Sequence, residues 1–509
     1  MSIPSRFNVF AKCLFLFWLA SLTTNCAATQ KKGKPSPVAA LRTKLDAILA
    51  DSALYRSQAG VKIVALRTGE VLYERNAHLL FHPASNQKLL TSSAALALLG
   101  ESFNFKTWLA CDSSAWQNGV IKGDLALIGR GNPDLTTADL SQLAQTLAQQ
   151  GVREVTGNLI CDDFYFDDMR WGSGWMWDDD PGTDYSRISA LTVNDNAVQV
   201  TVAPNAILGK PGQVMINAPS PFVEFINSSL TVARRGQIDS LGLPRLSLDR
   251  RWRESENVYL ISGAIGMDEA PRAETMNVLE PALLAGHIMR DLLLLNGIVV
   301  RGGIYRGFGP SKMRVLAEHN APLLPALTNF NKISDTLTGE LVLKAIGAER
   351  FGRPGSAPKG ARAIKLFLHS VGVDTLALKP VDGSGLSRYN LLTPEGVLEL
   401  LRAIWQREEW RNAFASTLPI AGVDGTLRNR MKGTSAEGVL RAKTGSLSGV
   451  SALSGYTVTA EGEELVFSMM MQHYLVRDSA VRGVQDRIGA ELCSFRRKPL
   501  NANSGRRAN

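Results

Sequence analysis

A serine and a lysine three residues apart open an apolar helix pattern in the stretch "FHPASNQKLLTSSAALALLG". A serine hydroxyl is a weak nucleophile until a nearby base removes its proton. Residues three apart share one face of a helix, so Lys88 can reach Ser85. The apolar helix is expected to be buried, with the positive end of its dipole beneath the serine. Ser85 and Lys88 are therefore a candidate nucleophile and base; the structural alternative is an N-cap serine beside a surface lysine.

The same spacing recurs in "SAPK", from Ser356 to Lys359, so the tetrapeptide alone is a weak signal. Pro358 lies inside this second copy, and proline disfavours the helical conformation for the residue before it. We therefore expect Ser356 to lie in a loop and to have no catalytic role.

A second group of reactive side chains lies near the C-terminus, in "RAKTGSLSGV". It places Lys443, Thr444, Gly445 and Ser446 at the start of a predicted strand, where glycine lets a substrate backbone approach closely. The lysine and the hydroxyl groups could hold a carboxylate, and the backbone N–H of Ser446 could donate to an oxyanion. Lys-Thr-Gly following Ser-x-x-Lys is a mark of penicillin-binding serine enzymes.

Such enzymes carry a Ser-x-Asn motif between the other two, and this chain offers two candidates. "SEN" at residues 255–257 leads into an apparent strand, and we interpret it as structural. The better candidate is "NKISDTLTGELVLKAIG", where Ser334 opens a helix whose apolar residues share one face. Its third position is Thr336, where the motif has asparagine.

The elements that must position these groups follow a changing pattern along the chain. A helix is expected at about residues 38–51, and a hairpin at residues 61–74 with its turn at Thr68 and Gly69. Short apolar runs broken by glycine, proline, asparagine and aspartate then predict a β-rich stretch from 101 to 275. Long helical patterns return from about 276, and two strands and an amphipathic helix close the chain.

Composition describes a globular protein of two or more domains, with 509 residues, 45% hydrophobic and 20% charged. The net charge of +9 is concentrated partly in the leader and in the C-terminal tail. Such a charge suits peripheral association with anionic wall polymers or lipid head groups. We find no nucleic-acid-binding motif, and no residue set that implies a metal or a cofactor.

Residues 1–28 have the layout of a cleaved secretory signal, with two basic residues, a short apolar run and then small residues. A basic linker follows at residues 29–37. A lipid anchor on Cys26 is a less favoured alternative, because asparagine precedes that cysteine where such sites prefer small residues. Cys111 and Cys161 could pair in an oxidising compartment, and the sequence leaves that pairing open.

With these motifs the sequence resembles the peptidase S13 family, which comprises the class C low-molecular-mass penicillin-binding proteins of the penicillin-binding protein 4 type. The resemblance runs from about Val38 to Cys493 and rests on "PASNQKLLT", "GDLALIGRGNPDL", "ISDTLTGEL", "VDGSGLSRYNLLTP", "LPIAGVDGTLRNR" and "AKTGSLSGV", in the family's order. It implies an α+β fold, in which a β-lactamase-like transpeptidase domain (an antiparallel sheet flanked by helices) spans 38–100 and 276–495. A β-rich insertion at 101–275 interrupts this domain, and a disordered basic tail occupies 496–509.

The resemblance implies a role for each motif residue. Ser85 would be the nucleophile, Lys88 its general base, and Ser334 the relay that protonates the departing amine. Lys443 would support the base electrostatically. Lys88 can act as a base only if its pKa falls from about 10.4 toward neutrality, and we expect burial and the charge of Lys443 to cause that fall.

The resemblance also implies how substrate is held. Lys443, Thr444 and Ser446 would bind the terminal carboxylate, with Gly445 leaving room for the peptide, and the N–H groups of Ser85 and Ser446 would form the oxyanion hole. Arg388 matches a position that contacts a diaminopimelate-type carboxylate, and Asp162 and Phe166 fall where the insertion contributes to that pocket. Thr336 departs from the family's asparagine and offers one hydroxyl in place of an amide. Substrate placement would then be looser, and activity reduced or lost.

The predicted function is that of a penicillin-sensitive serine D-Ala-D-Ala carboxypeptidase/DD-endopeptidase of the periplasm. Its substrates would be peptidoglycan stem peptides, and β-lactam antibiotics would act as covalent inhibitors. The alternative is a weak or inactive member of the same fold that binds peptidoglycan as a scaffold; intact Ser85, Lys88 and Lys443 argue against it. A β-lactamase is less favoured, because of the long insertion and the peptide-pocket candidates.

Overall fold

The computed structural model describes residues 36–217 and 222–498. The predicted signal sequence, Cys26, nearly all of the predicted linker and the tail beyond Lys498 therefore lie outside the described residues. Within the two described ranges, no helix is long and apolar enough to cross a membrane.

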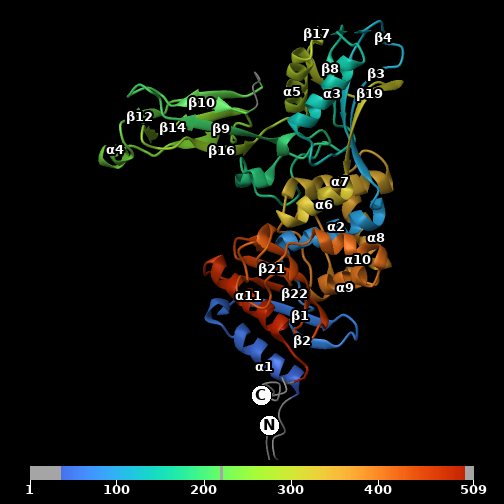
Figure 1. The fold of residues 1–509 in the computed structure, drawn as a ribbon, viewed down its shortest axis with the longest axis vertical. Helices are drawn as coiled ribbons and strands as arrows, with labels where there is room; N and C mark the ends of the chain where they lie inside the picture. Colours follow the sequence, from blue (N-terminus) through green and yellow to red (C-terminus); the bar gives the residue numbers. More distant parts are fainter. Residues whose placement is uncertain (1–35, 218–221, 499–509) are drawn as a thin grey trace, which may run out of the picture. The chain divides into compact units, whose positions relative to one another are not determined.

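A five-stranded antiparallel sheet carries the C-terminal motif on its edge strand (Figure 1). Its strands, in spatial order, are β2 (Val71–Arg75), β1 (Gln58–Ala65), β22 (Glu464–Gln472), β21 (Val450–Val458) and β20 (Arg441–Leu447). β1 and β2 form the predicted hairpin, and β21 and β22 are the two predicted adjacent strands. The hairpin of β1 and β2 joins the last three strands through the pairing of β1 with β22, so one sheet is built from distant segments.

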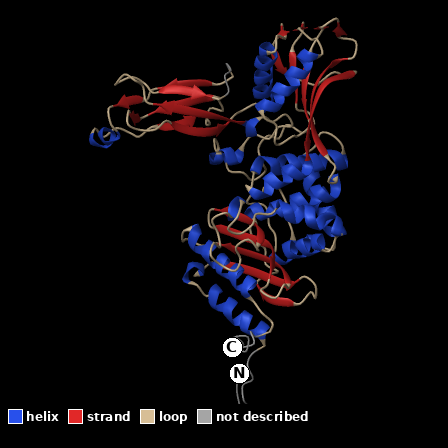
Figure 2. Cartoon of the chain, viewed as in Figure 1, coloured by secondary structure: helices blue, strands red, loops and turns tan. Residues whose placement is uncertain are grey.

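Helices cover both faces of this sheet (Figure 2). One face packs on α1 (Pro37–Leu49) and α11 (Asp478–Ser494), where Leu45, Phe467 and Ile488 are fully buried. The other face packs on a helical layer that contains α2 (Gln87–Leu99), α6 (Leu323–Lys332), α7 (Thr336–Phe351), α8 (Ala357–Ser370), α9 (Pro394–Trp405) and α10 (Glu408–Thr417). The candidate site lies where this helical layer meets the edge strand β20.

The inserted region is built mainly from small sheets, as predicted. Its largest sheet contains β18 (Ile304–Arg306), β8 (Leu159–Asp162), β6 (Leu125–Gly129), β3 (Asn104–Asp112) and β19 (Met313–Pro322). A second sheet contains β17 (Val299–Val300), β7 (Glu154–Val155), β5 (Val120–Ile121) and β4 (Trp116–Gln117). The helices α3 (Thr137–Gln149) and α5 (Pro281–Leu295) share one apolar core with these strands.

Three further small sheets lie in the described part of the inserted region. They comprise β10 (Gln213–Ile216), β9 (Ala197–Ala203) and β16 (Arg272–Asn277); β11 (Glu224–Asn227), β14 (Val258–Ser262) and β13 (Ser247–Arg250); and β12 (Leu230–Val232) with β15 (Ala264–Gly266). The short helix α4 (Arg235–Ser240) packs on β15. The prediction of an α+β chain whose sheet-and-helix domain is interrupted by a β-rich insertion is confirmed.

The sequence pattern placed the end of the inserted region at residue 275. Strand pairing shows that the region extends beyond that residue. β17, β18 and β19 follow that residue, yet they pair with β7, β8 and β3. The return of helical periodicity suggested the boundary, but α5, the first helix after it, packs on β8 inside the inserted region. Helical periodicity reports burial on one face and does not say which sheet the helix covers.

Cys111 and Cys161 are both buried free thiols. Cys111 lies on β3 and Cys161 on β8, and β6 runs between these two strands. Adjacent strands are about 4.8 Å apart, so residues two strands apart are too distant for a disulfide. The pairing that the sequence left open is therefore absent from this structure.

Candidate active site

The two copies of the Ser-x-x-Lys spacing have different structures. Ser85 lies in a single 3-10 turn, Ala84–Asn86, that leads into α2, and its side chain does not cap that helix. Ser356 is instead the N-cap of α8, and its hydroxyl accepts the backbone N–H of Lys359 at 3.3 Å. The prediction that Ser356 lies outside a helix is confirmed, since its backbone is extended. A helix nevertheless begins directly after it, because Pro358 falls in the first turn, where no N–H is needed. Ser356 thus has the N-cap role that was the structural alternative for Ser85.

Lys88 is fully buried and directed at Ser85. Its Nζ atom lies 3.2 Å from the Ser85 hydroxyl oxygen and donates to the backbone carbonyl of Ser384 at 2.6 Å. A neutral amine has one lone pair, so donation to Ser384 leaves the lone pair free to accept the Ser85 proton. The geometry suits a base and its nucleophile.

Burial lowers the pKa of Lys88 to about 8, because a charged amine loses its hydration there. Four carboxylates oppose this fall, those of Asp335, Asp382, Glu340 and Asp184. From the sequence we expected the charge of Lys443 to contribute to the low pKa of Lys88. The strongest charges acting on Lys88 are instead those of the four carboxylates. Repulsion between the two lysines affects the pKa of Lys443. Burial, and then the charge of Lys88, lowers that pKa well below its usual value.

Ser334 and Lys443 meet across the site although they are 109 residues apart. Lys443 is fully buried on β20, and its Nζ atom donates to the Ser334 hydroxyl oxygen at 2.9 Å. Ser334 precedes α7 in a left-handed conformation, with φ of 67°. Thr336 is the first residue of α7 and is 6% exposed. The motifs that the sequence matched separately are thus joined by contacts.

Gly445 lets β20 lie directly against the turn that carries Ser85. A Cβ atom at this position would be 2.7 Å from the carbonyl oxygen of Pro83 and 3.1 Å from the backbone nitrogen of Ser85. The first distance is shorter than any ordinary contact, so a larger residue would separate the two segments. Beside it, the Thr444 hydroxyl donates to the Thr426 hydroxyl at 2.8 Å.

The loop at residues 382–387 positions Lys88. In the sequence it stood out only as part of the block "VDGSGLSRYNLLTP". The Glu340 carboxylate of α7 accepts the N–H groups of Gly383 and Ser384 at 3.0 and 2.9 Å. Asp382 accepts the N–H groups of Gly385 and Ser387 at 2.8 and 2.6 Å. These buried carboxylates hold the loop so that the Ser384 carbonyl reaches Lys88. No spacing rule in the sequence points to them, since Glu340 reads as an ordinary helix residue.

Two arginines border the Lys-Thr-Gly strand. Arg388 donates to the carbonyl of Ser448 at 3.4 Å, and Arg482 of α11 donates to the hydroxyl of Ser446 at 3.3 Å. Arg388 was a sequence candidate; Arg482 was not, because α11 was interpreted only as a packing helix. Both guanidinium groups add positive charge where a substrate carboxylate is expected.

Asp162 and Phe166 are held inside the inserted region. The Asp162 carboxylate accepts the N–H groups of Phe164 and Gly309 at 3.0 and 2.9 Å, and Phe166 is 2% exposed. Among the described residues, no hydrogen bond or ion pair joins either of them to the Ser85–Lys88 pair. Their substrate-binding role stays a prediction from the resemblance.

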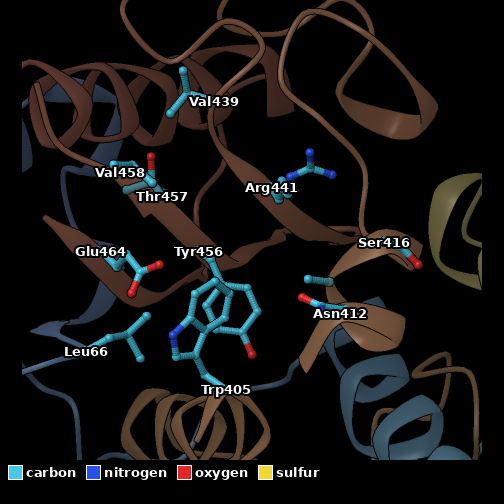
Figure 3. A pocket seen from close by; sticks show the side chains of 11 residues that line it. Leu66, Trp405, Asn412, Ser416, Val439, Arg441, Tyr456, Thr457, Val458 and Glu464 are labelled. Carbon is cyan, nitrogen blue, oxygen red and sulfur yellow. The ribbon is translucent and has the colours of Figure 1, made fainter. Parts of the chain in front are cut away.

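A cavity of about 360 Å³ lies at the start of β20, apart from the reactive groups (Figure 3). The rings of Trp405 and Tyr456 lie at its base, with centroids 4.8 Å apart, and Arg441 lines it from the strand. Arg441 precedes Lys443 by two residues, yet none of the predicted site residues lines this cavity. The candidate site is therefore the Ser85 cluster.

The comparison with protein families agrees with this cluster. The D-Ala-D-Ala carboxypeptidase 3 (S13) family model matches residues 41–491, which include all three motifs. The chain belongs to this family. As an S13 member it is 39% identical over 470 residues to a D-alanyl-D-alanine carboxypeptidase of Actinomadura sp. (strain R39), covering 89% of this chain and 85% of the relative.

A second relative comes from Haemophilus influenzae. The D-alanyl-D-alanine carboxypeptidase DacB of Haemophilus influenzae is 30% identical over 418 residues, covering 81% of this chain and 85% of the relative. The crystal structure of penicillin binding protein 4 (dacB) from Haemophilus influenzae matches with a TM-score of 0.78 at 28% identity, over 89% of this chain and 99% of that one. The likeness to this S13 structure includes the inserted region, since it covers nearly all of the chain.

Proposed function

We propose that this protein is a serine D-alanyl-D-alanine carboxypeptidase that acts on peptidoglycan stem peptides through an acyl-enzyme on Ser85. The observation that carries the proposal is the buried Lys88 amine, 3.2 Å from the Ser85 hydroxyl and with its pKa lowered to about 8. Membership of the S13 family and the carboxypeptidase names of its relatives support the same reaction.

In the first step the Ser85 oxygen attacks the carbonyl carbon of the terminal D-Ala-D-Ala peptide bond while Lys88 takes the hydroxyl proton. The carbonyl oxygen becomes an oxyanion and receives hydrogen bonds from the N–H groups of Ser85 and Ser446. One such donor is typically worth about 3–4 kcal/mol of barrier. Gly445 keeps these two N–H groups close by allowing β20 to touch the turn before Ser85.

In the second step the C–N bond breaks, and Ser334 relays to the departing D-alanine amine the proton that Lys88 took from Ser85, which returns Lys88 to its neutral form. Lys443 bonds the Ser334 oxygen and orients that hydroxyl. Lys443, Thr444 and Ser446 hold the terminal carboxylate, and Arg482 adds charge through its contact with Ser446. A water molecule then attacks the acyl carbon while the neutral Lys88 takes one of its protons. That proton passes to the Ser85 oxygen as the acyl bond breaks, so the Ser85 hydroxyl and the Lys88 amine are restored and the shortened peptide leaves.

We also propose DD-endopeptidase action, since the same acyl-enzyme forms when the departing amine belongs to a cross-linked neighbouring peptide. β-Lactams would acylate Ser85 in the same way, which the β-lactam complex of the Haemophilus influenzae relative supports, at a TM-score of 0.71 and 25% identity. The place of action would be the periplasm, reached through the predicted signal at residues 1–28, with peripheral association through basic surface charge.

The deciding experiment incubates the purified mature protein with a labelled penicillin and maps the adduct by mass spectrometry. We expect one acyl group on Ser85, absent from Ser85→Ala. A folded protein that forms no adduct and hydrolyses no pentapeptide would instead support the non-catalytic scaffold alternative. Digestion of cross-linked dimeric muropeptides by the active protein measures the endopeptidase reaction separately.

A further inference from the structure

A second cavity, rich in tryptophan, lies on the inserted region. It has a volume of about 460 Å³ and lies between the loop from Trp171 to Arg187 and the turn after β13. Its lining includes the side chains of Trp171, Trp177, Trp252, Arg187, Arg253 and Ser255. None of these residues belongs to the candidate active site.

One of the three tryptophans of this cavity is largely exposed, and the other two are half-buried. Trp177 is 72% exposed, and its ring lies 5.5 Å from that of Trp252 at an angle of 38°. The Arg253 guanidinium lies 4.6 Å from the centre of the Trp252 ring. Large exposed aromatic patches beside polar groups usually mark a binding surface, because leaving them in water is unfavourable.

Buried charges fix the walls of the cavity. Arg250, which is 1% exposed, donates to Asp180 at 2.5 Å and to Asn277 at 3.1 Å, so it joins the tryptophan loop to the small sheets. Arg187 donates to the other oxygen of Asp180 at 2.9 Å. Asn277 in turn donates to the backbone carbonyl of Gly182 at 3.0 Å. Buried polar contacts thus fix one part of the cavity wall, while Trp177 and Arg253 line the cavity from its exposed side.

The same loop borders the reactive groups. Trp171 packs edge-on against Trp175, with centroids 5.2 Å apart, and the Trp175 indole N–H donates to Asp382 at 3.1 Å. Asp382 holds the loop whose carbonyl binds Lys88, and the charge of Asp184 also acts on Lys88. One side of the loop therefore lies at the catalytic cluster, and the other side forms the tryptophan cavity.

We propose that the tryptophan cavity binds the glycan strand of peptidoglycan, the polymer of β-linked amino sugars from which stem peptides branch. This inference rests on the proposed function for its choice of polymer. The C–H faces of a pyranose ring stack on indole rings, while its hydroxyl and acetamido groups accept hydrogen bonds from arginine and serine. The cavity falls within the ~300–1,000 Å³ range of small-ligand sites, which fits a short run of sugar rings better than a flat protein interface. A strand held here would present its stem peptide to Ser85 across the shared loop.

The binding test uses Ser85→Ala protein, so that no catalysis is needed. Its probes are chitotetraose and peptidoglycan glycan strands stripped of stem peptides, with tryptophan fluorescence and calorimetry as readouts. We expect saturable binding that Trp177→Ala and Trp252→Ala each weaken by about tenfold or more, as for buried aromatic anchors. Tyr55→Ala, which removes a ring of similar exposure (73%) from the N-terminal part of the chain, is the matched control and should bind as before.

A second readout compares two substrates. The rate on intact sacculi, divided by the rate on a soluble pentapeptide, should fall in Trp177→Ala and stay the same in Tyr55→Ala. If Trp252→Ala does not fold, Trp177→Ala still decides the question, because its side chain is mostly exposed. No saturable binding of the glycan, equal affinity in the tryptophan variants, or binding of anionic phospholipid vesicles in its place would overturn the proposal.

The two proposals fail separately. A Ser85 that forms no penicillin adduct would overturn the proposed function but leave the glycan measurement on Ser85→Ala intact. Normal acylation of Ser85 together with absent glycan binding would overturn the inference alone.

Discussion

The Nζ atom of Lys443 donates a hydrogen bond to the Ser334 hydroxyl across 2.9 Å, and thereby connects the edge strand β20 to the segment before α7. Ser334 is held in a left-handed conformation that costs a non-glycine residue roughly 1–2 kcal/mol. Such strain persists only where the surrounding structure fixes the residue, and it concentrates at functional sites. The fully buried Lys443 amine holds the hydroxyl of this residue in place.

The rate of Ser85 acylation should rise with pH and level off above about pH 8. Lys88 accepts a proton only when its amine is neutral, and burial lowers its pKa to about 8. Below that pH the neutral fraction falls about tenfold for each unit. The measurement is the second-order rate of acylation by a fluorescent penicillin across this range. A rate independent of pH would contradict the assignment of Lys88 as the base.

Replacing Lys88 by arginine should lower acylation by about 10²–10⁴-fold, because a guanidinium stays charged and cannot act as a base. Lys44→Arg is the matched control, since Lys44 is 61% exposed and forms only a surface ion pair with Glu491. It should acylate at the wild-type rate. Equal rates for both variants would show that Lys88 acts only by packing.

Gly445→Ala should abolish most acylation while the protein stays folded. The added methyl group would collide with the Pro83 carbonyl and push β20 away from the backbone of Ser85. The control is Gly483→Ala in α11, where nothing lies within 4 Å of the new Cβ atom. That change should raise the free energy of unfolding by roughly 0.5–1 kcal/mol and leave acylation unaltered. Chemical denaturation and penicillin labelling measure both effects.

Thr336→Asn should increase kcat/KM for a D-Ala-D-Ala pentapeptide. Asparagine offers the substrate amide a donor and an acceptor, whereas threonine offers a single hydroxyl on a shorter side chain. Thr336 is the first residue of α7, two residues after Ser334, so the exchange leaves the helix interior unchanged. Steady-state kinetics of both proteins test this. Lower activity of the asparagine variant would mean that the site is shaped around threonine.

Glu340→Gln should remove a pH dependence from stability. Burial, and then the nearby charge of Asp382, raises the pKa of Glu340 from 4.5 to about 7. The folded protein therefore binds more protons than the unfolded chain between these values, so the free energy of unfolding of the wild type falls as pH rises from 4.5 to about 7. The difference in Tm between wild type and Glu340→Gln should change over this window. A constant difference would contradict the raised pKa.

Local patterns in the sequence determined several parts of this protein correctly. The hairpin at 61–74, the strands β21 and β22, and the helix whose face carries Val481, Val484, Ile488 and Leu492 all formed where the periodicity placed them. The three-residue spacing of Ser85 and Lys88 also indicated that their side chains could meet, because residues three apart share one face of a helix.

The tertiary structure decided which copy of that spacing brings its serine and lysine side chains together. At Ser356 the serine satisfies its own helix, whereas at Ser85 the Ser384 carbonyl and the edge strand β20 arrive from nearly 300 and more than 350 residues further along the chain. It also assigned β17–β19 to the inserted sheets. It placed Asp382 and Glu340 where they hold the loop that binds Lys88, and it brought Arg482 into contact with Ser446. Periodicity reports only which face of an element is buried. Which partner buries it depends on contacts between distant segments, and those set the pKa of Lys88 and the geometry of the site.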